Sequence, residues 1–316
     1  MLFSNQAKGV VYGCIAAISY GVNPLCAKML YREGINCNSV LFYRFLIGSV
    51  LLGLFMLFRK RGFALTRKEA CTLSVLGVIF AISSLTYFLS FHYMSAGVAA
   101  TLVFAYPVFV AILMAVFFKE RLKWPSLSAI VLTILGITLL YKDDTGQPIA
   151  TTGIVLIMLS ALAYALYIII INKSGIIMSS VKLTFYAMAS CWLCIVFYAL
   201  ITPTGELQML HGTQQWTYAT LLGLIPTVIS LVFMAMAIKC IGSTPTAVMG
   251  ALEPVTSIVL GLLLLGEAVT LRMSVGIFLI LSAVMLIILD EKLRKALSGV
   301  KVVRCGRLMV KKIRWR

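Results

Sequence analysis

The chain has 316 residues and a net charge of +17; 61% of its residues are hydrophobic and only 12% are charged. A water-soluble domain carries roughly 25% charged residues, and no soluble fold of this length has enough interior to hide so much apolar surface. The composition therefore excludes a soluble globular protein. It indicates an integral membrane protein, in which an apolar helix of about 20 residues spans the bilayer.

Ten apolar segments follow one another along the sequence, separated by mostly short connections. Each is long enough, or nearly so, to cross a bilayer as a helix. The sequence thus predicts an all-α integral membrane fold of ten transmembrane helices packed as antiparallel neighbours. The segments run approximately over residues 9–30, 38–58, 70–91, 97–118, 125–141, 153–172, 180–201, 215–238, 244–265 and 272–289.

Basic residues gather on one side of this predicted bundle. If the N-terminus is cytoplasmic, 22 of the 27 Lys and Arg residues fall on the cytoplasmic side and four on the other, with Arg44 inside the membrane. Cytoplasmic loops of membrane proteins carry such an excess. We therefore expect both termini in the cytoplasm, and the compact chain favours a bacterial cytoplasmic (inner) membrane.

The final segment, 291–316, contains ten basic residues and one acidic residue. It is interpreted either as a docking surface for anionic lipid headgroups or as a general topology anchor. Because topology accounts for the positive charge, no nucleic-acid partner is expected. The expected partners are the lipid bilayer and a small-molecule substrate.

An internal repeat divides the chain in two. Residues 93–141 align with 240–288 at a constant offset of 147, so that Tyr106-Pro107 falls on Glu253-Pro254. The predicted halves are 9–142 and 153–290, and each holds five spans. Because five is odd, the second half enters the membrane from the opposite side, and such inverted repeats are typical of secondary transporters.

These residues also carry a family resemblance. The segments AYPVFVAILMAVFFKERL at 105–122, ALEPVTSIVLGLLLLGEAV at 251–269 and FYRFLIGSVLL at 42–52 resemble the drug/metabolite transporter superfamily, with two EamA-type repeats. The resemblance covers roughly residues 9–289. It implies a ten-helix carrier with two inverted five-helix repeats around a central cavity, and it leaves the substrate open.

Two prolines fall inside predicted helices. Pro107 and Pro254 each remove an amide donor and free the carbonyl group four residues earlier, and lipid cannot satisfy such groups. We therefore predict helix kinks at both positions. The kinked segments either line a cavity or only shape the packing of the helices.

Glu253 is the most informative single residue. It lies about nine residues into the predicted helix 244–265, near the middle of the membrane, where an acid is costly and usually pairs, protonates or meets solute. Exposure to a cavity and a structural hydrogen-bonding role are both open. Its counterpart in the first half is Tyr106, so the repeats are not chemically symmetric.

Arg44 lies about six residues into the second predicted helix. It is interpreted as a contact for an anion, as an ion-pair partner of Glu253, or as a side chain that snorkels toward the membrane surface.

Polar and aromatic residues on four further helices complete the predicted site. Together with Glu253 and Arg44 they make a hydrogen-bonding, aromatic pocket for a small amphipathic solute; the alternative is ordinary helix packing. The predicted cavity residues are Tyr20, Asn23, Arg44, Tyr87, Tyr106, Tyr164 and Glu253.

Glu120 and Glu267 receive a structural interpretation instead. Leu265-Gly266-Glu267 fits a helix stop followed by an acid that opens the next helix, and neither acid is assigned a transport role.

No catalytic, metal or cofactor site is expected. His92 and His211 are the only histidines and show no metal-ligand spacing, and the pair Cys191 and Cys194 lies inside an apolar segment without a second pair. No phosphate-binding GxxxxGK[ST] motif is present, so the chain encodes no ATP-driven motor.

The sequence thus favours a secondary transporter or exporter of small metabolites that works by alternating access, with amino acids or related compounds as the cargo that the family resemblance suggests. The alternatives are a multidrug exporter for organic cations, a membrane sensor or assembly subunit, and an intramembrane enzyme. If Glu253 carries a coupling proton, Glu253→Gln should lose proton-driven flux.

Overall fold

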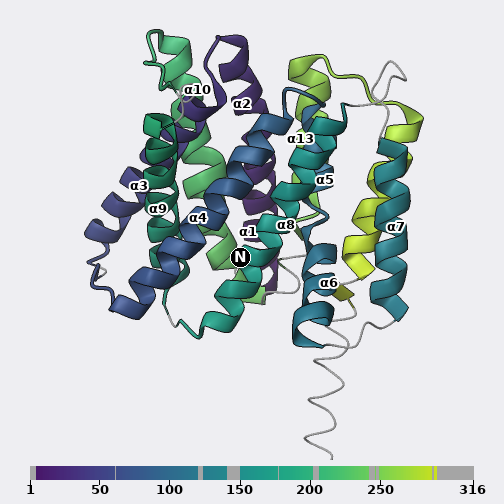
Figure 1. Ribbon diagram of the computed structural model, residues 1–316, viewed down its shortest axis with the longest axis horizontal. Coiled ribbons are helices and arrows are strands. Elements are labelled where there is room, and N and C mark those ends of the chain that lie inside the picture. Colours follow the sequence, from purple (N-terminus) through teal and green to yellow (C-terminus); the bar gives the residue numbers. More distant parts are fainter. Residues whose placement is uncertain are drawn as a thin grey trace, which may run out of the picture.

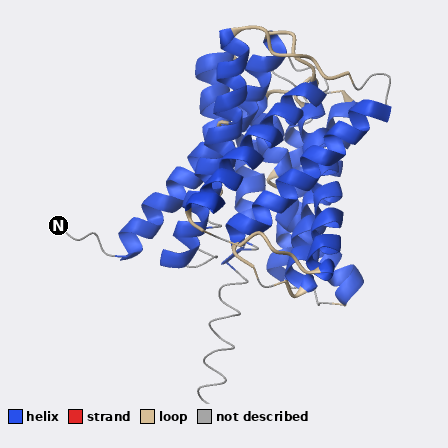
Figure 2. Cartoon of the chain, turned by 90° about the vertical axis from the view of Figure 1, so that its left-hand side faces the viewer, coloured by secondary structure: helices blue, strands red, loops and turns tan. Residues whose placement is uncertain are grey.

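The computed structural model describes residues 5–60, 62–119, 124–140, 150–176, 178–201, 206–241, 246, 249–286 and 288–289. Across these ranges every regular element is helical (Figure 2). Seven of the described helices are long and apolar enough to cross a membrane, and three shorter apolar helices accompany them. Each of the ten predicted apolar segments contains one of these helices, so the predicted all-α membrane fold is confirmed.

In the described part of the chain, the first five spans consist of the helices α1 to α7 (Figure 1). Asn36 starts the second span because its side-chain oxygen accepts a hydrogen bond from the Ser39 amide at 2.9 Å. Thr66 and Glu69 start the third with a reciprocal capping box. The helices are α1 (Asn5–Gly21), α2 (Asn23–Arg32), α3 (Cys37–Phe58), α4 (Arg67–Ser90), α5 (Ala96–Val103), α6 (Tyr106–Phe118) and α7 (Trp124–Leu140).

The second five spans also include interrupted helices. Glycines in the left-handed conformation follow two elements of this half, Gly175 after α8 and Gly266 after η2, as is common after a helix C-terminus. The elements are α8 (Thr151–Ser174), α9 (Ser180–Ile201), α10 (Thr213–Gly223), the π-helix η1 (Leu224–Ile229), α11 (Ser230–Ile241), α13 (Leu252–Leu260), the π-helix η2 (Gly261–Leu265) and a last helix, Leu271–Leu286.

The bundle is held together by contacts between the two sequence halves. Helix α1 packs on α11, α4 on α8, α3 on α9, and α5 on α13. Helix α7 lies beside the helix Leu271–Leu286, where Gly136 and Gly276 bring the two backbones close together (Figure 1). Neither half therefore forms a separate body, and any pocket near the centre of the bundle is lined by both.

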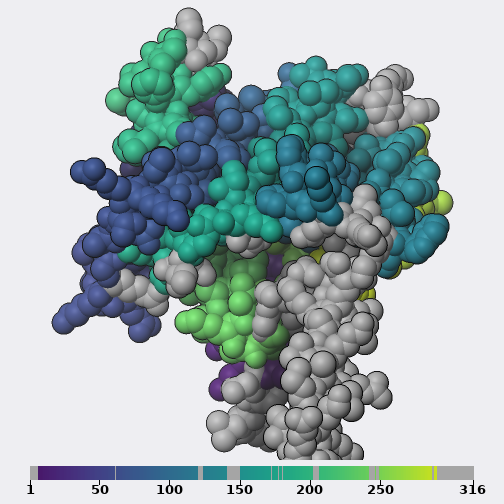
Figure 3. Space-filling view, turned by 60° about the horizontal axis from the view of Figure 1, so that its bottom comes forward, coloured from purple at the N-terminus to yellow at the C-terminus, as the bar shows by residue number. Residues whose placement is uncertain are grey.

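The connections gather at the two ends of the bundle (Figure 2). We call one the capped end; it is formed by residues 33–36, 91–95, 206–212 and 266–270, which hydrogen-bond across the halves. The other, the basic end, includes residues 59–66 and 174–179, and Figure 3 turns it toward the viewer. There Lys182 donates to the Ala64 carbonyl at 2.7 Å, and Tyr186 donates to the Phe63 carbonyl.

Three sequence predictions fall outside the described residues. The basic tail 291–316, Glu120 and most of the link between the halves lie there. The tail's proposed contact with anionic lipid stays a prediction.

Candidate functional site

Three spans are broken near their middle, and the breaks carry predicted site residues. Span one breaks at Val22, between α1 and α2; span four breaks between α5 and α6; and span nine breaks just before α13. A proline lies within the first three residues of the helix after each break, where a missing amide donor costs little. These are Pro24 in α2, Pro107 in α6 and Pro254 in α13.

The breaks of spans one and nine lie against each other. A Cβ atom added to Gly21 would fall 2.7 Å from the carbonyl oxygen of Glu253 and 2.6 Å from Cβ of Thr256. The Ser257 hydroxyl donates to the Gly21 carbonyl at 2.8 Å, so a backbone acceptor at the end of α1 is satisfied by α13 rather than by lipid. Glu253 is thereby placed at the end of α1, beside Tyr20.

Arg44 lies inside the bundle. Its side chain is 2% exposed, and its guanidinium carbon lies 5.1 Å from the Phe88 ring centroid and 5.5 Å from that of Phe45. The Tyr20 side chain lies within electrostatic range of the guanidinium, whereas Nε of Arg44 has no hydrogen-bonding partner in the described part of the chain. The snorkelling alternative is therefore wrong, because the side chain is enclosed by aromatic rings and faces the bundle interior.

Arg44 and Glu253 do not form the direct ion pair that the sequence allowed. Among the described residues the one ion pair joins two other side chains, Lys28 and Glu267. Instead, Tyr20 lies within electrostatic range of both Arg44 and Glu253, and so does Tyr87 on α4. The acid and the guanidinium therefore lie within electrostatic range of the same two tyrosines and form no ion pair with each other.

Tyrosines from both halves also lie near Glu253. The rings of Tyr106 and Tyr164 meet edge to face with centroids 4.8 Å apart, and both residues lie within electrostatic range of Glu253 and Tyr20. Tyr106 and Glu253, which occupy equivalent repeat positions, thus come together at the breaks of spans four and nine.

The structure gathers six of the seven predicted cavity residues into one cluster, which we call the tyrosine–charge cluster. Four of its members keep intermediate exposure although protein surrounds them: Tyr20, Tyr106, Tyr164 and Glu253. The seventh residue, Asn23, begins α2 beside the cluster and is fully buried. Neither polar atom of its amide has a hydrogen-bonding partner among the described residues, and we assign it no contact within the cluster.

Sequence reasoning missed the phenylalanines that surround the cluster, including two beside its tyrosines. Phe80 lies 6.4 Å from Tyr164, centroid to centroid, and Phe104 lies 5.9 Å from Tyr106. Phenylalanine at a helical position looks like ordinary core, so the sequence carries no signal that would single out these two.

Helix α4 carries Ser83 and Tyr87 one turn apart, on the same face. Ser83 donates to the Ser160 carbonyl at 3.0 Å, and Ser160 donates back to the Ser83 carbonyl at 2.7 Å. This pair joins α4 to α8 and leaves Tyr87, one turn further along, as the member of that face in the cluster.

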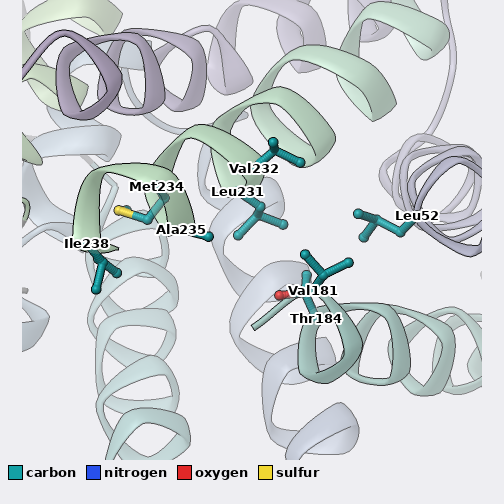
Figure 4. Close-up of a pocket in the computed structure, with 8 residues that line it drawn as sticks. All are labelled: Leu52, Val181, Thr184, Leu231, Val232, Met234, Ala235 and Ile238. Atoms are coloured by element: carbon teal, nitrogen blue, oxygen red, sulfur yellow. The ribbon is translucent and has the colours of Figure 1, made fainter. Parts of the chain in front are cut away.

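A separate small cavity lies toward the basic end (Figure 4). It has a volume of about 60 Å³ and is lined mainly by apolar side chains of α3, α9 and α11. None of the cluster residues lines it. No group of His, Cys, Asp or Glu residues that could hold a metal ion is found in the ranges that the structure describes.

Comparison with known proteins identifies the family. The sequence profile of the EamA-like transporter family matches residues 7–142 and again residues 151–289. The chain belongs to the EamA-like transporter family. It is an integral membrane protein of a family of membrane transporters, as the resemblance in the sequence implied.

Relatives of this EamA-family chain span nearly its whole length. The uncharacterized transporter YcbK of Bacillus subtilis is 24% identical over 305 residues, which cover 93% of this chain and 96% of the relative. The uncharacterized inner membrane transporter YicL of Salmonella typhimurium is 26% identical over 295 residues, 91% and 97% of the two chains. A crystal structure of a protein with 15% identity covers 89% of this chain and 96% of its own, with a TM-score of 0.64; at that identity the likeness shows the fold alone.

Proposed function

We propose that the protein is a secondary transporter that moves small zwitterionic solutes, amino acids or related metabolites, across a bacterial cytoplasmic membrane by alternating access. One observation carries the substrate class. Glu253 lies against the end of α1, next to Tyr20, Arg44 is buried within electrostatic range of the same tyrosine, and the two charged groups form no ion pair with each other. An ammonium group at Glu253 and a carboxylate group at Arg44 would satisfy both charges at once.

The aromatic walls of the cluster suit the same class. A cation near Tyr106 and Tyr164 gains attraction from their ring faces, while the carbon skeleton of a small solute gains from burial. A purely cationic drug would leave the buried Arg44 guanidinium without a counter-charge, and uncompensated buried charge is expensive. This argument favours zwitterions over the organic-cation alternative.

Alternating access is supported by the pattern of helix packing. If each span of the first half is exchanged with its equivalent in the second, the pairing of α1 with α11 becomes that of α8 with α4. The pairings of α3 with α9 and of α5 with α13 map onto themselves. Two halves related in this way, entering the membrane from opposite sides, would have inward-open and outward-open states of similar energy.

The first test is ligand-induced stabilisation of the purified protein. Zwitterionic amino acids, their amide or ester derivatives and cationic dyes are compared by thermal shift, because a ligand present at 100 times its Kd adds about 2.7 kcal/mol to the stability of the folded state. We expect stabilisation by zwitterions, and its loss in both Arg44→Gln and Glu253→Gln. Arg59→Gln is the matched control, since Arg59 also lies over a phenylalanine ring but is exposed at the basic end.

The second test is flux into proteoliposomes of the stabilising compound. Uptake driven by a pH gradient that survives in full in Glu253→Gln would exclude Glu253 as the site of proton coupling. Stabilisation by dyes alone would replace the proposal with an organic-cation exporter. Binding without any flux would favour a sensor.

A further inference from the structure

The capped end contains the one ion pair among the described residues. Nζ of Lys28 on α2 lies 2.7 Å from Oε1 of Glu267, which follows η2, and the two side chains are 19% and 14% exposed. Lys28 belongs to the first half of the chain and Glu267 to the second. The pair therefore links the two halves of the chain at the capped end.

Both partners make further hydrogen bonds. The Ala96 amide donates to both carboxylate oxygens of Glu267, at 2.8 and 3.0 Å, and Lys28 also donates to the Met94 carbonyl at 2.9 Å. Ala96 is the first residue of α5, where free amide donors and the helix dipole attract negative charge. A single carboxylate thus ties together α2, α5 and the segment after η2. The sequence analysis expected Glu267 to open the next helix, and this was wrong: the acid caps α5 of the other half instead.

These three elements are also the ones that carry the site. Helix α2, helix α5 and the unit α13–η2 are the capped-end halves of the three broken spans. At their opposite ends lie Asn23, the break that precedes Tyr106, and Glu253. For the tyrosine–charge cluster to open toward the capped end, these half-helices must separate there. Separation breaks the contacts of Glu267 first, because they join all three.

The two ends of the bundle are held together by different kinds of contact between the halves. At the basic end, the described contacts between halves join Lys182 and Tyr186 to neutral carbonyl groups and place the Lys173 ammonium over the Phe118 ring. At the capped end a full ion pair is reinforced by Arg32, whose Nη2 donates to the Leu265 carbonyl at 2.9 Å. Hydrogen bonds with one charged partner occur at both ends, but among the described contacts between the halves only the capped end joins two oppositely charged side chains.

We propose that the Lys28–Glu267 ion pair is a latch that closes the capped end of the transport path and must break whenever the cluster opens there. This inference rests on the proposed alternating-access function. A pair that merely stabilised the fold would join helices that stay together, whereas Lys28 and Glu267 join half-helices of opposite halves.

A native cysteine offers a direct readout. Cys26 lies on α2 between the cluster and Lys28, is 4% exposed and lies within electrostatic range of Arg44. In a variant whose other cysteines are replaced by serine, a membrane-impermeant maleimide should label Cys26 slowly while the latch is closed. A second single-cysteine variant that keeps exposed Cys71, at the opposite end of the bundle, reports which side of the membrane the reagent has reached.

Lys28→Met and Glu267→Gln should each raise the labelling rate of Cys26 about tenfold, the effect of losing one charge-assisted hydrogen-bonded pair. Lys28→Arg keeps the charge and should keep labelling slow. Arg272→Gln is the matched control, because Arg272 donates to the Thr138 carbonyl at the same end but outside the latch. Unchanged labelling in both latch variants would overturn the proposal.

A second measurement needs no cysteine replacement. Hydrogen–deuterium exchange over residues 96–103 of the full chain should speed up in Lys28→Met while exchange in α4 and α8 stays constant. Faster exchange throughout the chain would mean that the pair only stabilises the fold, and would refute the latch. Failure of flux in proteoliposomes would refute the proposed function but not the labelling result, so the two failures are distinguishable.

Discussion

Among the described glycines, Gly77 on α4 is the one at which an added Cβ atom would come closest to another helix. A Cβ atom at this position would lie 2.2 Å from Cβ of Ser190 on α9, and 3.2 and 3.3 Å from two backbone atoms of α9. Normal carbon–carbon contacts lie at about 3.5–4.0 Å. Helix association in membranes depends on such close packing at small residues, because lipid supplies no hydrophobic drive between helices.

Gly77→Ala should therefore force α4 and α9 apart by more than 1 Å at this contact, at a cost of about 1–3 kcal/mol. Ser190→Gly removes the atom at 2.2 Å and leaves only the two contacts near 3.2 Å, which a small adjustment relieves. By itself Ser190→Gly should cost about 0.5–1 kcal/mol, the usual effect of glycine in a helix. The double variant should then cost about as much as Ser190→Gly alone.

The assay is thermal unfolding of the purified protein in detergent, followed by a thiol-reactive dye or tryptophan fluorescence, for the two single variants and the double variant. Gly62→Ala is the control, because nothing lies within 4 Å of a Cβ atom there, and it should leave the midpoint nearly unchanged. If the costs of Gly77→Ala and Ser190→Gly simply add, the two helices are not in steric contact at these residues and the reasoning fails.

Two further predictions concern α4 and the connection that follows it. Ser83→Ala breaks the reciprocal bond with Ser160 and should cost only about 0.6 kcal/mol, the average for hydrogen bonds between membrane helices; a loss above 2 kcal/mol in the thermal unfolding assay would contradict this. The pKa of His92 is held below its usual value, first by loss of hydration and then by the positive charge of Lys28. The unfolded chain therefore binds more protons at this residue, so part of the stability is present above about pH 6.5 and is lost as the pH falls through the lowered pKa. The thermal midpoint should show this pH-dependent part, and His92→Gln should remove it.

The fold was predictable because its main determinant is composition along the chain. Ten apolar segments specify ten helices, since a backbone in lipid must satisfy its own hydrogen bonds. The breaks were only partly predictable. Pro107 marks a break two residues before it, but Pro226 lies within the π-helix η1, where the span continues with a wider turn. Proline alone does not tell which of these outcomes the neighbouring helices will stabilise.

The site was partly predictable, because a polar or charged residue within a membrane span is costly and usually has a structural or functional role. Tyr20, Glu253 and Arg44 stand out in apolar segments, and the structure brings them together. Their mutual geometry was not predictable, because the depth of a residue in one helix says nothing about rotation about the helix axis. The Lys28–Glu267 pair was missed for a related reason: each residue is ordinary near a membrane surface, and only the folded chain brings residues 239 positions apart into contact.

The asymmetry between the repeats has a consequence for how binding and closure are connected. Arg44 comes from the first half and Glu253 from the second, although equivalent positions hold tyrosine or an apolar residue. A zwitterion bound as proposed would contact one charge of each half, so the solute itself would bridge the halves across the cluster. Binding would then favour the states in which the halves approach each other, since a ligand shifts an equilibrium only by its differential contacts.

The latch at the capped end bridges the same two halves without solute, so the two bridges act on the same movement. We therefore expect zwitterions that slow the labelling of Cys26 in the single-cysteine variant to slow it after Lys28→Met as well, and to have no such effect once Arg44 is neutralised.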